Sequence, residues 1–195
     1  MAESLLSEAL CTLAEAKERL KQPSADTTYD DLVTQLINEA TGTIEAYCGR
    51  KLKSRAYTDS VHDGTGGGRM DAREFPVTVV TSAKEVYKDG VTPDRTITVT
   101  GLVQIEGRRT LYLPEGWPYG TKNVKLTYTA GESGVNLKTL RGAVLELIAD
   151  AWVRFNTAGG AEALTVSAGG QSVTIGAVSI PRRVESMLRN FRRLT

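Results

Sequence analysis

The N-terminal part of the chain carries hydrophobic residues at helical spacing. Between Leu5 and Leu20, apolar positions recur every three or four residues. Within this stretch Thr12 and Glu15 fit a capping box, in which two side chains bond each other's backbone amides at the start of a helix. The pattern therefore predicts a first helix that begins at Leu13.

A longer amphipathic stripe follows between residues 29 and 48, with apolar side chains on one helical face. Its apolar members are Leu32 or Val33, Leu36, Ile37, Ala40, Ile44 and Tyr47. Thr28, together with Asp31, offers an N-terminal cap, and Gly49 stands where a left-handed residue commonly ends a helix. The sequence predicts a second helix over these residues.

From about residue 52 to residue 131 the pattern changes to that of β-structure. Short runs rich in β-branched residues alternate with turn signals such as Asp89-Gly90. We predict five to seven short antiparallel strands that form a small sandwich or barrel. Two loops stand out, a glycine-rich one at residues 63–68 and one at residues 114–118 that contains Trp117.

The helical period returns between Leu137 and Phe155, with Asn136 as the expected cap. The expected apolar face holds Leu140, Ala143 or Val144, Leu147, Ile148, Ala151 and Phe155. The simplest architecture is an α+β fold in which three main helices form a small bundle and the β-rich segment is inserted between the second and third. The expected divisions of the chain are residues 1–51, 52–131, 132–157 and 158–195.

The end of the chain has a different amino-acid composition. Small residues, threonine and valine dominate residues 158–179, and the alternating apolar positions favour a hairpin or an extended arm that pairs with another chain's sheet edge. Pro181 then opens a short amphipathic helix at the end of this linker and arm. Its apolar side is expected to hold Val184, Met187, Leu188 and Phe191.

Positive charge is concentrated in this last segment. Residues 181–195 contain five arginines and one glutamate, whereas the rest of the chain has a small acidic excess. Three interpretations stay open: contact with nucleic-acid phosphates, an ordinary solvated helix end, or a helix that docks in a partner's groove with arginines at the rim. The apolar stripe favours the docking helix, which the long segment before it would allow to reach away from its own body.

Composition narrows the functional classes. The 195-residue chain has a formal net charge of +1, which gives no case for a protein that coats nucleic acid or an anionic membrane. Its most apolar stretch, residues 143–155, is interrupted by charges and is shorter than the roughly 20 residues that a membrane span needs. Cys11 and Cys48 are expected to be buried thiols in a reducing cytosol rather than a disulfide.

The sequence contains little that points to catalysis. The single histidine, His62, is expected in a solvated turn without the partner groups that base catalysis requires, so we expect no enzyme, metal site or cofactor. The glycine run lacks the lysine of a phosphate-binding loop. Trp117 is expected to cap the β-rich core. Gly66, Gly67, Gly68 and Trp117 remain candidate partner-contact loops.

Several stretches, taken in order along the chain, resemble one known family. They are Leu13 to Leu20, Leu32-Val33 through Leu36-Ile37 to Ala40, Ile44 to Arg50, Tyr128 to Gly131, and the ending Ile180-Pro181, Val184, Leu188 and Phe191-Arg192-Arg193. Their succession, rather than any single motif, resembles the head–tail connector (adaptor, or head-completion) proteins of long-tailed bacteriophages.

The resemblance implies a structural protein of the virion neck, assembled in the host cytoplasm. It implies a ring, typically of twelve subunits, that lies beneath the portal, extends the DNA channel and helps to close the head after packaging. Its partners would be the portal protein, the next neck or tail protein and further copies of itself, with DNA passing through without sequence-specific binding and no membrane involved. The family's C-terminal arm reaches the portal, which assigns portal binding to Ile180, Pro181, Arg182, Arg183, Val184, Met187, Leu188, Phe191, Arg192 and Arg193.

Three alternatives stay open. The first is a neck or tail-completion ring protein that docks on the tail side. The second is a β-sandwich module that binds carbohydrate or peptide with Trp117 as its platform. The third is a hydrolase centred on His62.

Overall fold

A computed structural model describes residues 4–87, 91–99, 104–106, 108–157 and 180–193. The chain divides into two compact units, a helical unit (residues 1–51 and 134–195) and a β unit (residues 52–133) that interrupts it. The described residues form four α-helices and seven strands, all paired antiparallel. The predicted mixture of helices and an antiparallel sheet is confirmed. The predicted turn at Asp89-Gly90 and the predicted hairpin or arm at residues 158–179 lie outside the described residues.

Helix α1 (Leu13–Arg19) begins where its capping box predicted. The Thr12 amide donates to Glu15 Oε2 at 2.9 Å, and the Glu15 amide donates to Thr12 Oγ1 at 3.3 Å. Each side chain therefore satisfies an amide that the first turn of a helix leaves without a partner.

Helix α2 (Asp30–Cys48) ends at Gly49, which adopts the expected left-handed conformation with φ of 66°. The predicted cap at Thr28 is wrong, because Tyr29 occupies the capping position and makes no side-chain bond there. Thr28 instead donates its amide to Asp26 Oδ1 at 3.0 Å, within a turn that precedes the helix.

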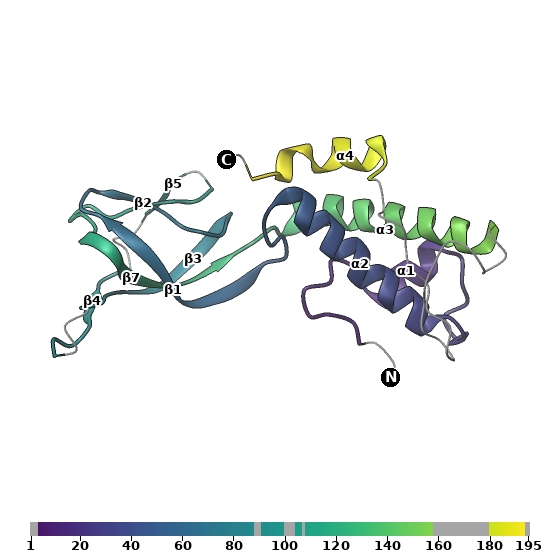
Figure 1. Ribbon diagram of the computed structural model, residues 1–195, viewed down its shortest axis with the longest axis horizontal. Coiled ribbons are helices and arrows are strands. Elements are labelled where there is room, and N and C mark those ends of the chain that lie inside the picture. The colour runs from purple at the N-terminus through teal and green to yellow at the C-terminus, as the bar shows by residue number, and fades with distance from the viewer. Residues whose placement is uncertain (1–3, 88–90, 100–103, 107, 158–179, 194–195) are drawn as a thin grey trace. The chain divides into compact units, whose positions relative to one another are not determined.

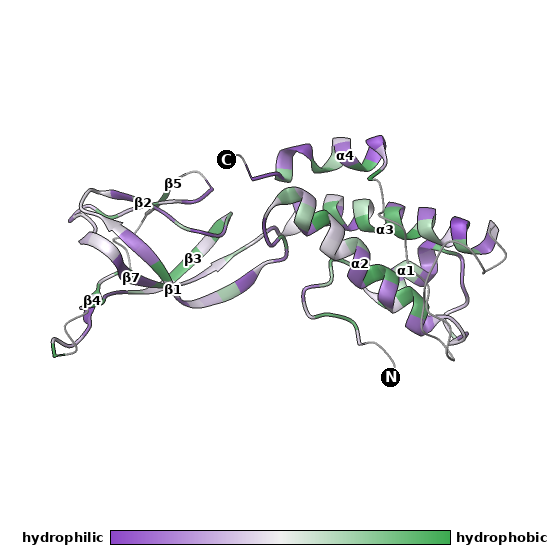
Figure 2. Ribbon diagram, in the orientation of Figure 1, coloured by the Kyte–Doolittle hydropathy of each residue, from purple (hydrophilic) through white to green (hydrophobic). Residues whose placement is uncertain are grey.

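Helix α3 (Gly134–Thr157) begins before the cap expected at Asn136, which lies inside the helix. Its buried residues are Leu140, Ala143, Val144, Leu147, Ile148, Ala151 and Trp152. The predicted apolar face is therefore confirmed except at Phe155, which is half-buried and forms a ring cluster with Trp152 and Tyr29. Figure 2 shows hydrophobic and hydrophilic residues alternating along α2 and α3, as expected for helices with one buried face.

The helical unit is held together by contacts of α1 with α2 and α3, of α2 with α3, and of α3 with the C-terminal helix α4 (Arg182–Leu188) (Figure 1). The chain before α1 is anchored to α2 by two buried polar residues. Asn38 Oδ1 accepts from the Leu6 amide at 3.1 Å, and Thr41 Oγ1 accepts from the Leu10 amide at 3.4 Å. Within the described residues, no helix is long and apolar enough to cross a membrane.

The β unit contains two sheets. The first has the order β1 (Arg55–Thr65), β7 (Tyr119–Ala130), β3 (Val77–Glu85), β4 (Arg95–Ile97). The second has the order β2 (Arg69–Asp71), β6 (Thr110–Tyr112), β5 (Gln104–Glu106). Side chains of both sheets form one core, in which Leu111 and Leu126 are fully buried. Strand β1 lies at an edge, and its pairing with β7 loses register twice, between Tyr57 and Ser60 and between His62 and Gly64.

The segments that lead into and out of the β unit run side by side. The Glu132 amide donates to the Leu52 carbonyl at 2.7 Å, and Lys53 forms an isolated parallel bridge with Glu132. The Glu132 carboxylate is 1% exposed and is paired with Arg108. A Cβ at Gly131 would lie 2.5 Å from Ser54, so the two segments approach as closely as a glycine permits.

Two glycines in the predicted loop at residues 63–68 make a matched test of the β unit. A Cβ at Gly64 would overlap the Pro118 carbonyl oxygen, whereas a Cβ at Gly67 would meet no atom within 4 Å. We expect Gly64→Ala to lower the free energy of unfolding by about 2 kcal/mol or more, and Gly67→Ala to change it by less than about 0.5 kcal/mol. Urea denaturation followed by tryptophan fluorescence measures both, and equal effects of the two variants would contradict the described approach.

Candidate functional site

The predicted portal-binding segment forms a short helix with a turn after it. Pro181 precedes α4 as expected, and a 3₁₀ turn, η1 (Arg189–Phe191), follows it. Val184 and Leu188 are 0% exposed, and Phe191 is 6% exposed. Helix α4 runs alongside α3 (Figure 1), and Met187 points at Gly142, where an added Cβ would lie 3.3 Å from Met187 Cε.

This packing corrects one expectation. The apolar stripe of α4 was expected to lie in a partner's groove, but it is buried on the helical unit of its own chain. The physical reason is that a helix of two turns is unstable alone and needs a surface to pack against. Burying a Val, Leu or Phe side chain stabilises such a contact by about 1.5–3 kcal/mol each.

Polar contacts fix α4 at this site, which we call the α4 receptor and define as Tyr47, Cys48, Arg50, Glu146 and Asp150. Arg183 Nη2 lies 2.7 Å from Asp150 Oδ1 and 2.9 Å from Glu146 Oε2. Tyr47 Oη donates to Glu185 Oε1 at 3.0 Å.

The backbone after α4 is bound to the end of α2 as well. Arg50 Nε donates to the Phe191 carbonyl at 2.8 Å, and this arginine is buried. The Arg193 amide donates to the Cys48 carbonyl at 2.8 Å. Both ends of the C-terminal segment are therefore held by the helical unit.

Glu146 links three helices. Its Oε1 accepts from Arg19 of α1 at 2.6 Å, while its Oε2 faces Arg183 of α4. Exposed ion pairs contribute little one by one, so we assign this network the role of fixing the direction of α4 rather than most of its binding energy.

Three exposed arginines lie on or just after α4. Arg182 belongs to α4, Arg189 belongs to η1, and Arg192 follows that turn. The Arg192 guanidinium also stacks over the Tyr47 ring at 5.1 Å. We call these three arginines the basic face. Several of the residues assigned to portal binding from sequence remain accessible to solvent. They are the basic face, the ion-paired Arg183, and the half-buried Ile180, Pro181, Met187 and Arg193.

Trp117 is not available to a partner. Its side chain is 2% exposed within the β core, and its Nε1 donates to the Leu111 carbonyl at 3.1 Å. The candidate contact at Trp117 is therefore wrong, whereas its expected place at the core is confirmed. Gly66 and Gly67 are exposed in the turn between β1 and β2, and Gly68 is half-buried. The Gly67 carbonyl accepts a hydrogen bond from the Trp117 amide at 2.8 Å.

His62 lies in strand β1 and is buried, not in the solvated turn that the sequence predicted. Its ring packs edge-on against Tyr128 at 6.0 Å between centroids, and its Nε2 has no hydrogen-bond partner. Burial lowers the His62 pKa, and the charge of Arg73 lowers it further, against smaller opposite effects of the Asp71 backbone and Asp63. The described residues contain no group of three side chains able to hold a metal ion.

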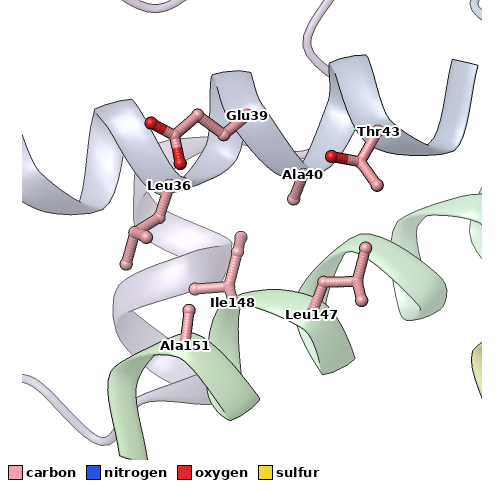
Figure 3. A pocket seen from close by; sticks show the side chains of 7 residues that line it. All are labelled: Leu36, Glu39, Ala40, Thr43, Leu147, Ile148 and Ala151. Carbon is pink, nitrogen blue, oxygen red and sulfur yellow. The ribbon is translucent and has the colours of Figure 1, made fainter. Parts of the chain in front are cut away.

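A narrow groove separates α2 from α3 (Figure 3). Leu36 and Ala40 of α2 face Leu147, Ile148 and Ala151 of α3 across it, with Glu39 and Thr43 also lining it. The five apolar side chains are less than a tenth exposed. The groove is therefore a packing seam between two helices and offers little apolar surface to a ligand.

Sequence reasoning missed the α4 receptor. Tyr47 and Arg50 are more than 130 residues from their partners in the chain, and Asp150 is 33 residues from Arg183. The only available signal was that acidic residues on the predicted third helix complement the arginines of the C-terminal segment.

Leu188→Ala tests the docking of α4. We expect it to lower the free energy that holds α4 on the receptor by about 2–4 kcal/mol, because it removes a fully buried side chain. Hydrogen–deuterium exchange should then be faster at residues 182–191. The exposed Arg189→Ala is the matched control and should leave exchange unchanged. Equal protection in the two variants would contradict the packing.

His62 should make the stability of the β unit depend on pH. Because folding lowers its pKa below 6.5, the unfolded chain binds the proton more readily, so stability is complete above pH 6.5 and falls as the pH drops below it. Urea denaturation at several pH values should show this loss in the natural chain and a smaller one in His62→Phe. Identical pH profiles would contradict the burial of an uncharged His62.

Comparisons with known proteins agree with this architecture. The family model for the head completion protein matches residues 9–194. Among solved structures, a chain from the neck of an empty gene transfer agent particle, computed with C6 symmetry, has a TM-score of 0.64 at 18% identity, and one from a native gene transfer agent virion has 0.62 at 16%. A chain from the native neck, computed with C12 symmetry, has a TM-score of 0.59 at 18% identity. Each match covers 100% of this chain and 95% of the other. No curated protein matches. The chain belongs to the head completion protein family.

Proposed function

We propose that the chain is a structural protein of the neck of a phage-like particle. The family match over residues 9–194 carries this proposal, and the shared fold with chains from gene transfer agent necks supports it. In this proposal a bundle of α1 to α3 and an inserted β sandwich form a subunit that does no catalysis. The only histidine is buried in the β core, without the arrangement of groups that a hydrolase needs.

We infer a homo-oligomeric ring of twelve copies that lies beneath the portal, extends the DNA channel and helps to close the filled head. The C12 symmetry used for one of the similar neck structures supports this copy number. A net charge of +1 suits a channel through which DNA passes without sequence-specific binding. The buried thiols of Cys11 and Cys48 suit assembly in the reducing host cytoplasm.

The portal contact is assigned to residues 180–193, as the resemblance implied. We propose more narrowly that the basic face and its neighbours Ile180 and Pro181 make this contact; the burial of the apolar stripe supports this choice. An acidic surface on the portal is the complementary partner. The other end of the ring would contact the next neck or tail protein, for which the exposed turn at Gly66 and Gly67 is a candidate.

Native mass spectrometry of the chain with the portal protein of the same genome tests the proposal. We expect portal-bound rings in a copy number that matches the portal. The double variant Arg182→Glu/Arg189→Glu should weaken binding at least tenfold and steepen its loss with salt, because it reverses the charge of the basic face. Deletion of residues 180–195 should abolish binding.

The control Lys138→Glu/Arg154→Glu changes the charge equally at exposed positions of α3 and should bind as the natural chain does. A natural chain that ignores the portal but assembles with a tail protein would replace the proposal with the tail-side ring. Equal binding by both double variants would place the portal contact elsewhere.

A further inference from the structure

One aromatic side chain of the β unit stands almost entirely in water. Among the described residues, no large hydrophobic side chain is more exposed than that of Tyr119, at 89%. The residue is nevertheless part of regular structure, since it is the first of strand β7 and pairs with Thr65 of β1. Tyrosine rings ordinarily bury much of their area on folding, so a ring left in water on an ordered strand is available to a partner.

The Tyr119 side chain has a fixed support. It lies against Gly66, where an added Cβ would come within 3.2 Å of both Cβ and Cδ2 of Tyr119. Gly66 has a φ of 71°, which is a left-handed conformation that favours glycine. We call Tyr119, Gly66 and Gly67 the aromatic tip.

The turn beneath the ring is braced by hydrogen bonds. Thr65 Oγ1 donates to the Arg69 carbonyl at 2.8 Å and accepts from the Gly67 amide at 3.4 Å. The Gly67 carbonyl in turn accepts from the amide of the buried Trp117 at 2.8 Å. The aromatic tip is therefore ordered before any partner arrives, and an ordered surface loses less conformational freedom when it binds.

The exposed charges in the loops beside Tyr119 balance one another. Arg69 and Lys122 are exposed cations, and Asp63 and Glu115 are exposed carboxylates. Binding of DNA phosphates needs an excess of cations, which this surface lacks. An uncharged aromatic ring with charges of both signs around it instead matches the centre and rim of a protein–protein interface.

We propose that Tyr119 is the anchor through which the chain binds the next neck or tail protein. Its ring enters an apolar pocket of that partner, which also supplies a hydrogen-bond acceptor for the hydroxyl group. This inference rests on the proposed function, because it needs a ring with a second end. The basic face assigned to the portal belongs to the helical unit, whereas Tyr119 belongs to the β unit, so the two partners use different surfaces of one chain.

Substitution of Tyr119 tests the anchor. Portal-bound rings are immobilised, and each purified neck and tail protein of the same genome is passed over them in surface plasmon resonance. We expect one of these proteins to bind, Tyr119→Ala to weaken its binding about thirtyfold or more, and Tyr119→Phe to weaken it about threefold to tenfold. Tyr87→Ala is the matched control, because it removes another exposed tyrosine of the β unit and should leave binding unchanged.

A second variant blocks the tip without removing the ring. A Cβ at Gly67 meets no atom within 4 Å, so Gly67→Gln adds a side chain only to the solvent beside the tip. We expect it to leave urea denaturation nearly unchanged and to weaken binding of the partner at least tenfold. Gly42→Gln is its control, since Gly42 of α2 is exposed and has equally open space around it.

All these variants should bind the portal as the natural chain does. Natural binding of the neck or tail protein by both Tyr119→Ala and Gly67→Gln would overturn the inference, as would portal-bound natural rings that bind none of these proteins. Loss of the ring itself in Tyr119→Ala would also overturn it, because the ring would then contact another copy. A natural chain that does not bind the portal contradicts the proposed function instead, and native mass spectrometry distinguishes that result.

Discussion

The rest of the molecule depends on one constraint. The two segments that join the β unit to the helices approach each other closely. The backbone bond between Glu132 and Leu52 and the small size of Gly131 keep these segments side by side. The buried Glu132 carboxylate, paired with Arg108, secures this arrangement, because a carboxylate held away from water is stable as an anion only where such partners surround it. A whole β unit can therefore be inserted while α2 and α3 pack as if a short loop joined them.

The packing of α2 on α3 in turn creates the surface on which the C-terminal segment depends. The receptor combines the end of α2, at Tyr47 and Arg50, with acidic residues in the middle of α3. Neither helix alone offers both the apolar surface and the polar contacts that hold α4. The basic face therefore has a defined position only when the helical unit is complete, which links the stability of the core to this surface.

Local signals in the sequence predicted the features that are local in the structure. The capping box at Thr12 and the left-handed Gly49 act within a few residues, so both were predictable. The burial of Val184 and Leu188 on their own unit was not, because a stripe of apolar residues does not say which surface covers it. His62 was misplaced because neighbouring glycines indicate a turn, whereas pairing with the long strand β7 extends β1 to Thr65. Long-range pairing outweighed local composition there.

The irregular edge of the first sheet has a consequence for the protein before it assembles. An open edge strand is a template for uncontrolled growth of sheets between molecules. Because β1 carries an extra residue between Tyr57 and Ser60, a straight strand from another molecule would lose its register with β1 at that point. The β unit is thus a poor seed for fibres. A subunit of this kind can therefore reach a high concentration without joining its sheets edge to edge.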